Sequence, residues 1–328
     1  MKSFEWTNAA SLDEAIAQLG TGVMVKAGGV DLLDRLKEGL ESPRRLVNLR
    51  GIGGLDNIRS STGDDGDLVL GPLTTLAAIE AHAGVRKRFG ALAEACAHAA
   101  TPQIRNMATI GGNLVQRPRC WYFRSADFNC RKKGGEVCFA LEGENQYHAI
   151  VANKVCAIVH PSSVSTALVA YGATVKLKGK AGERVVPLEQ FFVLPDKDPR
   201  RENQLGADEL ITEVRLPAPA KGTGAAYHKQ TEKESFDWPL ADVAVVLELD
   251  GRTCKRASII LGAAAPVPWR AKSSEAILGG RAVDEHAAEA AANAAVQGAT
   301  PLAKNAYKLP IVRAIVRRTI LAAAGGAA

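Results

Sequence analysis

Several patterns that would assign a protein to a common class are missing from this chain of 328 residues. It has no run of 18 apolar residues, so the sequence predicts no membrane span. Residues 1–15 lack the apolar core of a signal peptide, and we expect no export signal on this chain. The P-loop pattern is also absent. Residues 51–56 contain a GxG, but Asp56 stands where a dinucleotide fingerprint needs its third glycine, which excludes a Rossmann site.

Cysteine is scarce, and the charge is moderate. Six cysteines are too few for a disulfide scaffold in a chain of this length, and a local cluster of them in a reducing compartment indicates metal or redox use. The formal net charge of +6 favours acidic partners or phosphate-bearing ligands, but it does not imply nucleic acid. The length is typical of a protein with two or three domains.

The first fifty residues carry a glycine pair at a position that suits a phosphate. Strand-like and helix-like segments alternate there in the order β-α-β-α-β, which predicts a small α/β unit. Gly28-Gly29 lies between the second strand, residues 22–27, and a helix that reaches about residue 38. Backbone N–H groups and the helix dipole at such a point favour a bound phosphate. An ordinary tight turn is the alternative interpretation of this pair.

A second glycine pair makes the cofactor interpretation stronger. Gly111-Gly112 follows an alternating apolar and polar run, residues 108–110, that resembles a strand. Glycines leave no Cβ in the way of a ligand, successive N–H groups can form an anion-binding concavity, and Asn113 adds amide donors. Two such pairs in one chain favour a phosphate-bearing cofactor over two unrelated turns.

Beyond the first unit, the pattern predicts a larger α+β unit and then a separate C-terminal unit. Pro and Gly cluster at residues 217–222, which is the best candidate for a domain boundary. A tight hairpin is expected around Asp250-Gly251, followed by alanine-rich helices. The strands expected after residue 140 are 148–152, 156–159, 174–177, 184–187, 209–216, 225–230, 241–249 and 254–261, and the helices are 165–171, 284–296 and 309–323.

A group of cysteines falls in or beside a polar segment that is rich in glycine and lysine. These residues are Cys120, Cys130, Cys138 and Cys156. None of them forms CxxC, so the spacing alone is a weak motif. Four thiolates can hold an iron-sulfur cluster or a structural zinc, and the arginines and lysines around them would lower the pKa values of the thiols. Four unrelated thiols are the alternative at this point.

Taken together, these motifs resemble the medium, FAD-binding subunit of the molybdenum hydroxylases, the family that includes the xanthine dehydrogenase and carbon monoxide dehydrogenase flavoproteins. Within that family the chain looks most like the flavin subunit of bacterial aldehyde oxidoreductases of the periplasmic type. The resemblance covers essentially the whole chain. It is carried by residues 26–33 (KAGGVDLL), 103–106 (QIRN), 108–114 (ATIGGNL) and 160–162 (HPS).

The resemblance implies an α+β fold of the vanillyl-alcohol-oxidase (PCMH) type. In this fold a small α/β subdomain and a larger α+β subdomain hold FAD, and a C-terminal α+β domain of the carbon monoxide dehydrogenase flavoprotein kind follows. The corresponding segments would be 1–55, 56–220 and 221–328. The first glycine loop would wrap the FAD pyrophosphate, and the second would contact pyrophosphate and ribitol. The implied FAD-binding residues are Lys26, Ala27, Gly28, Gly29, Val30, Asp31, Leu32 and Leu33 in the first loop, and Thr109, Gly112 and Asn113 in the second.

The resemblance implies two further FAD positions. Lys229 matches a lysine in the first C-terminal strand that commonly lies beside the isoalloxazine, where a cation would stabilise the anionic reduced ring. A solvated strand residue is the alternative interpretation. Ser163 stands where the family usually has an aspartate after His-Pro-Ser. Its hydroxyl can hydrogen-bond a cofactor, but it brings no charge.

Residues 117–156 form an insertion that most members of the family lack. It resembles the extra [4Fe-4S] loop of hydroxybenzoyl-CoA reductases and of periplasmic aldehyde oxidoreductases, and its spacing is closer to the latter. The resemblance therefore implies a [4Fe-4S] cluster in this chain. Its ligands would be Cys120, Cys130, Cys138 and Cys156. Such a cluster could carry electrons or mainly brace the fold, and the sequence does not decide between the two.

The implied function is that of an electron relay in a heterotrimeric complex. A large molybdenum-cofactor subunit would oxidise the substrate, and a small subunit would pass electrons through [2Fe-2S] clusters to FAD in this chain and on to an external acceptor. The chain carries no molybdenum-cofactor or [2Fe-2S] pattern of its own. The alternatives are a self-contained flavin oxidase of the same fold and a zinc-stabilised, non-enzymatic scaffold. The expected location is the cytoplasm, or the periplasm after export with a signal-bearing partner.

Overall fold

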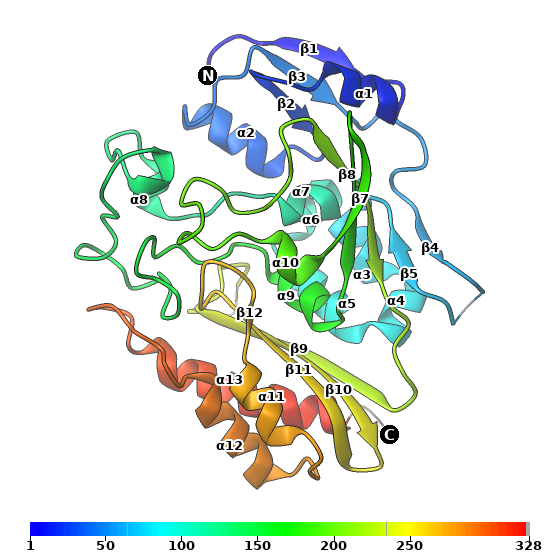
Figure 1. The fold of residues 1–328 in the computed structure, drawn as a ribbon, viewed down its shortest axis with the longest axis vertical. Coiled ribbons are helices and arrows are strands. Elements are labelled where there is room, and N and C mark those ends of the chain that lie inside the picture. The colour runs from blue at the N-terminus through cyan, green and yellow to red at the C-terminus, as the bar shows by residue number, and fades with distance from the viewer. Residues whose placement is uncertain (64, 234, 326–328) are drawn as a thin grey trace.

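The computed structural model describes residues 1–63, 65–233 and 235–325. Over these residues the chain forms three successive units, built around sheets of three, five and four strands (Figure 1). In Figure 1 the N-terminal unit lies at the top, the five-stranded unit in the middle and the C-terminal unit at the bottom. No helix in this described part of the chain is long and apolar enough to span a bilayer.

The N-terminal unit is the predicted α/β unit. Its elements are β1 (Glu5–Asn8), α1 (Leu12–Gln18), β2 (Val23–Lys26), α2 (Val30–Lys37) and β3 (Arg45–Asn48). The sheet is parallel, with the strand order β1-β3-β2. Helix α1 begins at a capping box: the Ser11 hydroxyl accepts from the N–H of Glu14 at 3.1 Å, and the Glu14 carboxylate accepts from the N–H of Ala10 at 2.8 Å.

The second unit is an antiparallel sheet with helices packed against it. Its strands are β4 (Ile58–Ser60), β5 (Leu68–Leu70), β6 (Thr174–Gly179), β7 (Gly182–Pro187) and β8 (Glu209–Leu216), in the order β4-β5-β8-β6-β7. Its helices are α3 (Leu76–Ala81), α4 (Ala83–Arg88), α5 (Gly90–Ala97), α6 (Pro102–Met107), α7 (Ile110–Leu114), α9 (Ser163–Ala170) and α10 (Leu188–Phe191). Apolar side chains such as Leu70, Ile79, Leu168 and Val214 form a buried core between sheet and helices. This core fixes where the second glycine pair lies.

The segment around the second glycine pair differs from the prediction. The sequence predicted a strand at residues 108–110, just before the glycines, but this stretch joins two short helices, α6 and α7. Thr101 caps α6 by accepting from the N–H of Ile104, and Thr109 caps α7 by accepting from the N–H of Gly112, each at 3.3 Å. An alternation of three residues is too short to establish a strand against such caps.

The cysteine loop, residues 117–156, has little regular structure. Its helical turns are α8 (Trp121–Arg124) and η1 (Arg131–Lys133). Although residues 148–159 are all described, the strands predicted at 148–152 and 156–159 do not form. Ala152 has a φ of 51°, which interrupts an extended run. The side chains of Asn153 and Lys308 hydrogen-bond nearby backbone carbonyls, which supplies partners that a strand ladder would otherwise provide.

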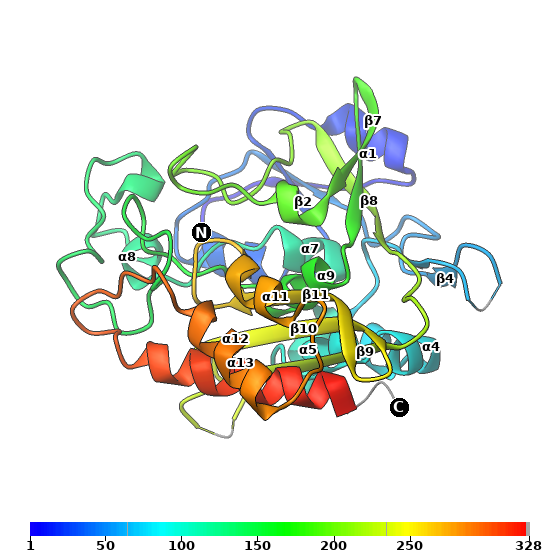
Figure 2. The same cartoon turned by 60° about the horizontal axis from the view of Figure 1, so that its bottom comes forward.

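The C-terminal unit is an antiparallel sheet covered on one face by helices (Figures 1 and 2). Its strands are β9 (Thr223–Gln230), β10 (Ala241–Asp250), β11 (Thr253–Gly262) and β12 (Trp269–Arg270), in the order β12-β11-β10-β9, and its helices are α11 (Lys272–Leu278), α12 (Glu285–Ala295) and α13 (Lys308–Gly325). The hairpin predicted around Asp250-Gly251 is confirmed, since β10 pairs with β11 and Gly251 has a φ of 58°. Helix α11 was not predicted, because no side chain caps its start.

Candidate functional site

A cleft with a volume of about 350 Å³ lies between the N-terminal unit and the five-stranded unit. The first glycine loop, residues 26–33, contributes one wall, and the second glycine loop, residues 108–113, contributes another. Residues 209–211 of β8 also line it, together with Phe236 and Trp238 from the β9–β10 connection. A cavity of this size falls in the range typical of small-molecule and cofactor sites.

The two glycine loops are brought together by backbone contacts that exclude side chains. A Cβ added to Gly28 would lie 1.9 Å from the carbonyl oxygen of Met107, so only glycine permits this approach. A Cβ on Gly111 would lie 2.9 Å from the carbonyl oxygen of Pro72. Gly29 has a φ of 87°, a conformation that favours glycine, and it begins α2. The glycines therefore shape the cleft before any ligand enters.

The start of α2 offers backbone donors to the cleft. Gly29 precedes the helix without a side-chain cap, and Val30, Asp31 and Leu32 of the first turn line the cleft. The N–H groups of a first helical turn have no partners inside the helix, and the helix dipole adds a partial positive charge. This arrangement suits a phosphate group.

The second glycine loop adds a side-chain donor. Asn113 Oδ1 accepts from the Ser162 hydroxyl at 2.5 Å, which fixes the orientation of the amide. Among the described residues, none hydrogen-bonds the Asn113 Nδ2 group. A ligand in the cleft can therefore accept a hydrogen bond from Asn113. Beside it, a Cβ on Gly112 would meet only the Thr109 hydroxyl within 4 Å, so Gly112 faces open space.

Most of the residues that the sequence suggested for FAD line this cleft. They are Ala27, Gly28, Gly29, Val30, Asp31, Leu32, Thr109, Gly112, Asn113 and Ser163. Lys26, Leu33 and Lys229 lie outside its lining. Lys26 Nζ lies 5.6 Å from the ring centroid of Trp6, Leu33 is 37% exposed, and Lys229 Nζ donates to the backbone carbonyl of His98 at 2.7 Å.

A buried carboxylate stands behind Ser163. The Ser163 hydroxyl donates to Asp242 Oδ2 on β10 at 2.9 Å. Burial raises the pKa of Asp242 to about 6, although the hydrogen bond from Ser163 acts in the opposite direction. Gly262 on the neighbouring strand makes room for it, since a Cβ there would lie 1.8 Å from Asp242 Oδ1. Sequence reasoning missed Asp242 because its only link to the cleft is a contact across 79 residues.

Arg119 and Trp238 also line the cleft, and the sequence assigned neither of them to it. The Arg119 guanidinium lies 4.8 Å from the centroid of the Trp238 ring, at a distance typical of a cation–π contact. In the sequence, Arg119 is only one of the arginines and lysines around the cysteines. Trp238 belongs to a connection without any motif, so no local signal could have found it.

The Asp31 carboxylate forms ion pairs with arginines rather than facing the cleft as a free acceptor. Its carboxylate pairs with Arg35 at 3.0 Å, Arg119 at 2.7 Å and Arg124 at 2.8 Å, and it accepts from the backbone N–H of Arg117 at 3.1 Å. Burial opposes its ionisation, but the guanidinium groups outweigh that effect and hold the pKa of Asp31 below its ordinary value. The backbone N–H of Asp31 is therefore the group that it can offer to a ligand.

The four cysteines of the loop line one small cavity, and all four thiols are free. They are Cys120, Cys130, Cys138 and Cys156. Lys132 and His148 line the same cavity, and His148 Nε2 lies 3.2 Å from Cys120 Sγ. Burial lowers the pKa of His148 to about 4, so its imidazole is neutral at pH 7. The sequence identified the thiols but not this histidine, which belongs to no ligand motif.

The thiols differ in their protonation. A hydrogen bond from Cys156 lowers the pKa of Cys138 to about 6, whereas the same bond raises the pKa of Cys156. Burial raises the pKa of Cys120 to about 11. Within the described residues, no group of three or more His, Cys, Asp or Glu side chains is arranged to hold a metal ion.

Comparisons with known proteins supply the family. The model of the FAD binding domain in molybdopterin dehydrogenase matches residues 2–219, and that of the CO dehydrogenase flavoprotein C-terminal domain matches residues 225–323. The aldehyde oxidoreductase FAD-binding subunit PaoB of Escherichia coli (strain K12) is 34% identical over 318 residues, which cover 95% of this chain and 96% of that protein.

Carbon monoxide dehydrogenase shows the same relationship in sequence and in structure. Its medium chain from Hydrogenophaga pseudoflava is 30% identical over 328 residues, which cover 98% of this chain and 96% of that protein. A solved structure of the enzyme from this organism matches with a TM-score of 0.78 and 29% identity, covering 100% of this chain and 99% of the matched chain. The α+β FAD-binding fold implied by the resemblance is thus confirmed, and the chain belongs to the FAD-binding subunits of the molybdenum hydroxylase family.

Proposed function

We propose that this chain is the FAD-binding electron-transfer subunit of a molybdenum-containing complex of the aldehyde oxidoreductase type. The observation that carries the proposal is the presence, in one chain of this family, of both a glycine-walled cleft and a cavity lined by four free thiols. The E. coli relative described above is named an aldehyde oxidoreductase FAD-binding subunit, which supports aldehydes as the substrate class. Xanthine-type substrates are the second candidate within the family.

In this proposal the two glycine loops hold the FAD diphosphate. The first-turn N–H groups of α2 and the Asn113 amide would donate to it, and the Arg119 guanidinium would add positive charge. Bound FAD would supply the step between two-electron and one-electron transfer. Ser163, oriented by Asp242, would hydrogen-bond the cofactor. Lys229 is proposed as a nearby cation rather than a contact, because His98 holds its Nζ outside the cleft lining.

The cysteine cavity would hold a [4Fe-4S] cluster, which would supply one-electron transfer. Its proposed ligands are Cys120, Cys130, Cys138 and Cys156. Four thiolates are the usual donor set for such a cluster, and each would bind a different iron atom, so the sulfurs need not crowd around one ion. The Lys132 ammonium would offset the negative charge of the thiolates. A zinc-stabilised, non-enzymatic scaffold is disfavoured because the chain belongs to a family of FAD-binding subunits.

The proposed partners are a large molybdenum-cofactor subunit and a small [2Fe-2S] subunit. Support comes from the carbon monoxide dehydrogenase relative, which is named a medium chain, and from the lack of either cofactor pattern in this sequence. The proposed division of this chain is 1–55 and 56–220 for FAD and 221–328 for the C-terminal domain. The external acceptor would receive electrons from FAD. The complex would act in the cytoplasm, or in the periplasm if it is exported with a signal-bearing partner subunit.

Electron flow through the chain tests this function. The purified chain, loaded with FAD, is mixed anaerobically with an aldehyde, first alone and then with the large and small subunits. We expect the flavin absorbance to bleach only when both partners are present. Bleaching of the isolated chain by an aldehyde, alcohol or amine would instead favour a self-contained flavin oxidase. If the flavin absorbance did not bleach even with both partners present, a role as electron relay would be contradicted.

A further inference from the structure

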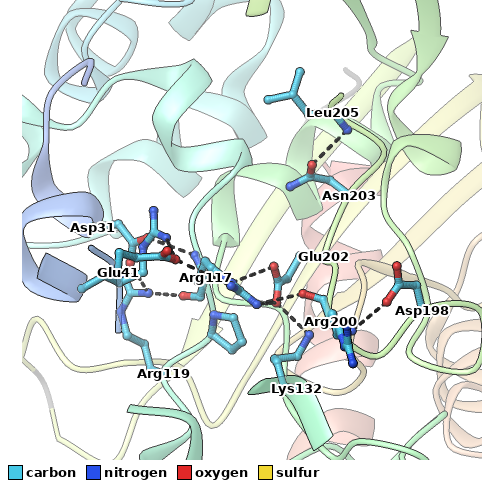
Figure 3. Close-up of polar contacts among 12 residues, drawn as sticks. Asp31, Glu41, Arg117, Arg119, Lys132, Asp198, Arg200, Glu202, Asn203 and Leu205 are labelled. Atoms are coloured by element: carbon cyan, nitrogen blue, oxygen red, sulfur yellow. Dashed lines mark hydrogen bonds and ion pairs between the residues drawn. The ribbon is translucent and has the colours of Figure 1, made fainter. Parts of the chain in front are cut away.

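A series of polar contacts joins the cleft between the two glycine loops (the flavin cleft) to the cavity lined by Cys120, Cys130, Cys138 and Cys156 (the cysteine cavity), as Figure 3 shows. It begins at Asp31, which lines the cleft, and it ends at Lys132, which lines the cavity. Arg117 and Glu202 are the two links between them, and neither of these residues lines the cleft or the cavity. Their roles are therefore not explained by direct contact with a cofactor.

Arg117 uses its backbone toward the cleft and its side chain toward the cavity. Its N–H donates to Asp31 Oδ2 at 3.1 Å. Its Nε lies 3.0 Å from Glu202 Oε2, and its Nη2 donates to Glu202 Oε1 at 3.2 Å and to the backbone carbonyl of Arg200 at 2.9 Å. The ring of Phe123 lies 4.7 Å from the guanidinium carbon. Arg117 is thus held by its backbone on the side of the cleft and by its side chain on the side of the cavity.

Glu202 is the junction of the series. Its Oε1 accepts from Lys132 Nζ at 2.7 Å, and the two side chains are only 7% and 1% exposed. A buried ion pair adds little net stability, because desolvation offsets the attraction, but the loss of one partner is costly. Such a pair is better suited to fixing a geometry than to stabilising the fold as a whole.

The loop that carries Glu202 also reaches the cleft directly. Leu205, three residues further on, lines the cleft, and its N–H donates to Asn203 Oδ1 at 3.1 Å (Figure 3). A movement of Lys132 in the cysteine cavity would therefore reach the cleft by two routes, through Arg117 to Asp31 and through residues 202–205.

We propose that Glu202 is a positioning residue for both cofactor sites, so that occupancy of the flavin cleft and order in the cysteine cavity favour each other. The identity of the two cofactors rests on the function proposed above. Coupling of this kind is reciprocal: a cluster that raises the affinity for FAD by some factor is itself favoured by FAD by the same factor. Factors of roughly 5 to 150 are typical for coupled sites.

The first experiment measures the affinity of the full chain for FAD in its iron-loaded and iron-free forms, by the quenching of flavin fluorescence. In the natural chain, removal of iron should weaken FAD binding by roughly fivefold or more. In Glu202→Gln, the two forms should bind FAD with equal affinity. The matched control is Glu213→Gln, whose carboxylate pairs with Arg59 and Arg215, each at 2.9 Å, and which lines neither the cleft nor the cavity. That control should keep the full effect of iron removal.

A second variant distinguishes a loss of coupling from a folding defect caused by Glu202→Gln. Glu202→Gln leaves the Lys132 ammonium buried without its carboxylate, which alone could prevent loading. In the double variant Lys132→Met with Glu202→Leu, both charges of the buried pair are removed and apolar groups of similar size replace them. Arg117 loses Glu202 as well, but it keeps the Glu41 carboxylate at 3.8 Å and the backbone carbonyl of Arg200 at 2.9 Å. We expect this variant to fold like the natural chain, as judged by circular dichroism, and still to lose the dependence of FAD affinity on iron.

A third measurement needs no cluster. In the iron-free chain, a maleimide labels the cavity cysteines, and mass spectrometry follows the rate of labelling with and without saturating FAD. FAD should slow labelling roughly fivefold in the natural chain and in Glu213→Gln, and it should have no effect in Glu202→Gln. A purely structural role for Glu202 would raise the labelling rate but leave its dependence on FAD intact.

These outcomes separate the coupling from the proposed function. In a natural chain that binds iron, FAD affinity independent of iron together with labelling independent of FAD would overturn the coupling. Failure of the natural chain to bind iron would remove the cluster from the proposed function, and the labelling result alone would then decide the coupling.

Discussion

The cleft between the glycine loops depends on close backbone approach at its glycines, whereas the cysteine cavity is lined by functional side chains. In the cleft, Gly28 and Gly111 occupy positions where a Cβ would strike the carbonyl oxygens of Met107 and Pro72. In the cavity, four thiols, an imidazole and an ammonium converge from a loop that forms no strand ladder. The cleft thus depends on the absence of Cβ atoms at its glycines, and the cysteine cavity depends on the functional groups of its side chains. Substitutions should affect the two sites in different ways.

The largest effect is expected when the missing Cβ of the cleft is restored. Gly28→Ala places a methyl group 1.9 Å from the Met107 carbonyl, and a backbone atom cannot move away cheaply. We expect the free energy of unfolding to fall by about 3 kcal/mol or more and FAD binding to be lost. Gly53→Ala is the control, since a Cβ there meets no atom within 4 Å. Flavin titration and urea denaturation measure both effects, and a Gly28→Ala chain that still binds FAD tightly would refute this role of the glycine loops.

The cavity should respond to the loss of a single functional group instead. Cys130→Ala removes one proposed ligand without adding bulk, so iron content should fall from four atoms per chain toward zero, while FAD binding persists at reduced affinity. Cys254→Ala, which removes a buried thiol of β11 outside the cavity, should leave the iron content unchanged. Iron and acid-labile sulfide assays check this pair. Full iron content in Cys130→Ala would show that Cys130 is not a ligand.

Asp31 lines the cleft, and its carboxylate pairs with two arginines of the cysteine loop, Arg119 and Arg124. Asp31→Asn keeps the backbone of the first glycine loop but removes the carboxylate that pairs with Arg35, Arg119 and Arg124. We expect the free energy of unfolding to fall by about 3 kcal/mol, at the lower end for a buried ion pair, because Glu41 still pairs with Arg35 and Glu38 with Arg124. Thermal denaturation measures the change. Stability equal to that of the natural chain would show that the arginines are satisfied without Asp31.

A smaller effect is expected at Asp242, a carboxylate behind the cleft wall whose pKa is raised by burial. Its pKa is raised from 3.8 to about 6 by burial, so the folded chain binds this proton more tightly than the unfolded chain does. The contribution of this proton to stability is therefore complete at low pH and is lost as the pH rises through 6. Relative to Asp242→Asn, the natural chain should lose about 2 kcal/mol between pH 4.5 and pH 7.5. Urea denaturation at the two pH values measures this, and parallel pH profiles would contradict it.

The sequence was sufficient for the parts of the molecule that depend on short-range patterns. The N-terminal alternation of strands and helices, the Asp250-Gly251 hairpin and the glycine loops are local signals, and the structure places both loops on one cleft. The strand expected before Gly111 was wrong because threonine caps at residues 101 and 109 start helices there. The prediction of strands at 148–152 and 156–159 was wrong because the side chains of Asn305 and Lys308, from a distant segment, donate to the backbone carbonyl of His148.

Other features of the site depend on contacts between distant residues. Asp242 reaches Ser163 across 79 residues, and Glu202 reaches Lys132 across 70. Neither pair has a spacing or a motif that a single sequence can reveal. Arg119 was noticed as a cation near cysteines, but its place in the flavin cleft follows only from the packing of the loop against α2. Long-range side-chain pairing is thus the information that sequence patterns leave out.

The central claim is that one chain holds FAD between its glycine loops and a [4Fe-4S] cluster among its four loop cysteines. The most direct test is to measure FAD, iron and acid-labile sulfide per chain in a single anaerobically purified sample supplied with FAD. The account predicts one FAD, four iron atoms and four sulfides per chain, with a yellow-brown visible spectrum. A colourless protein without FAD would contradict the account of the cleft, and a yellow protein with FAD but without iron would contradict the account of the cysteine cavity.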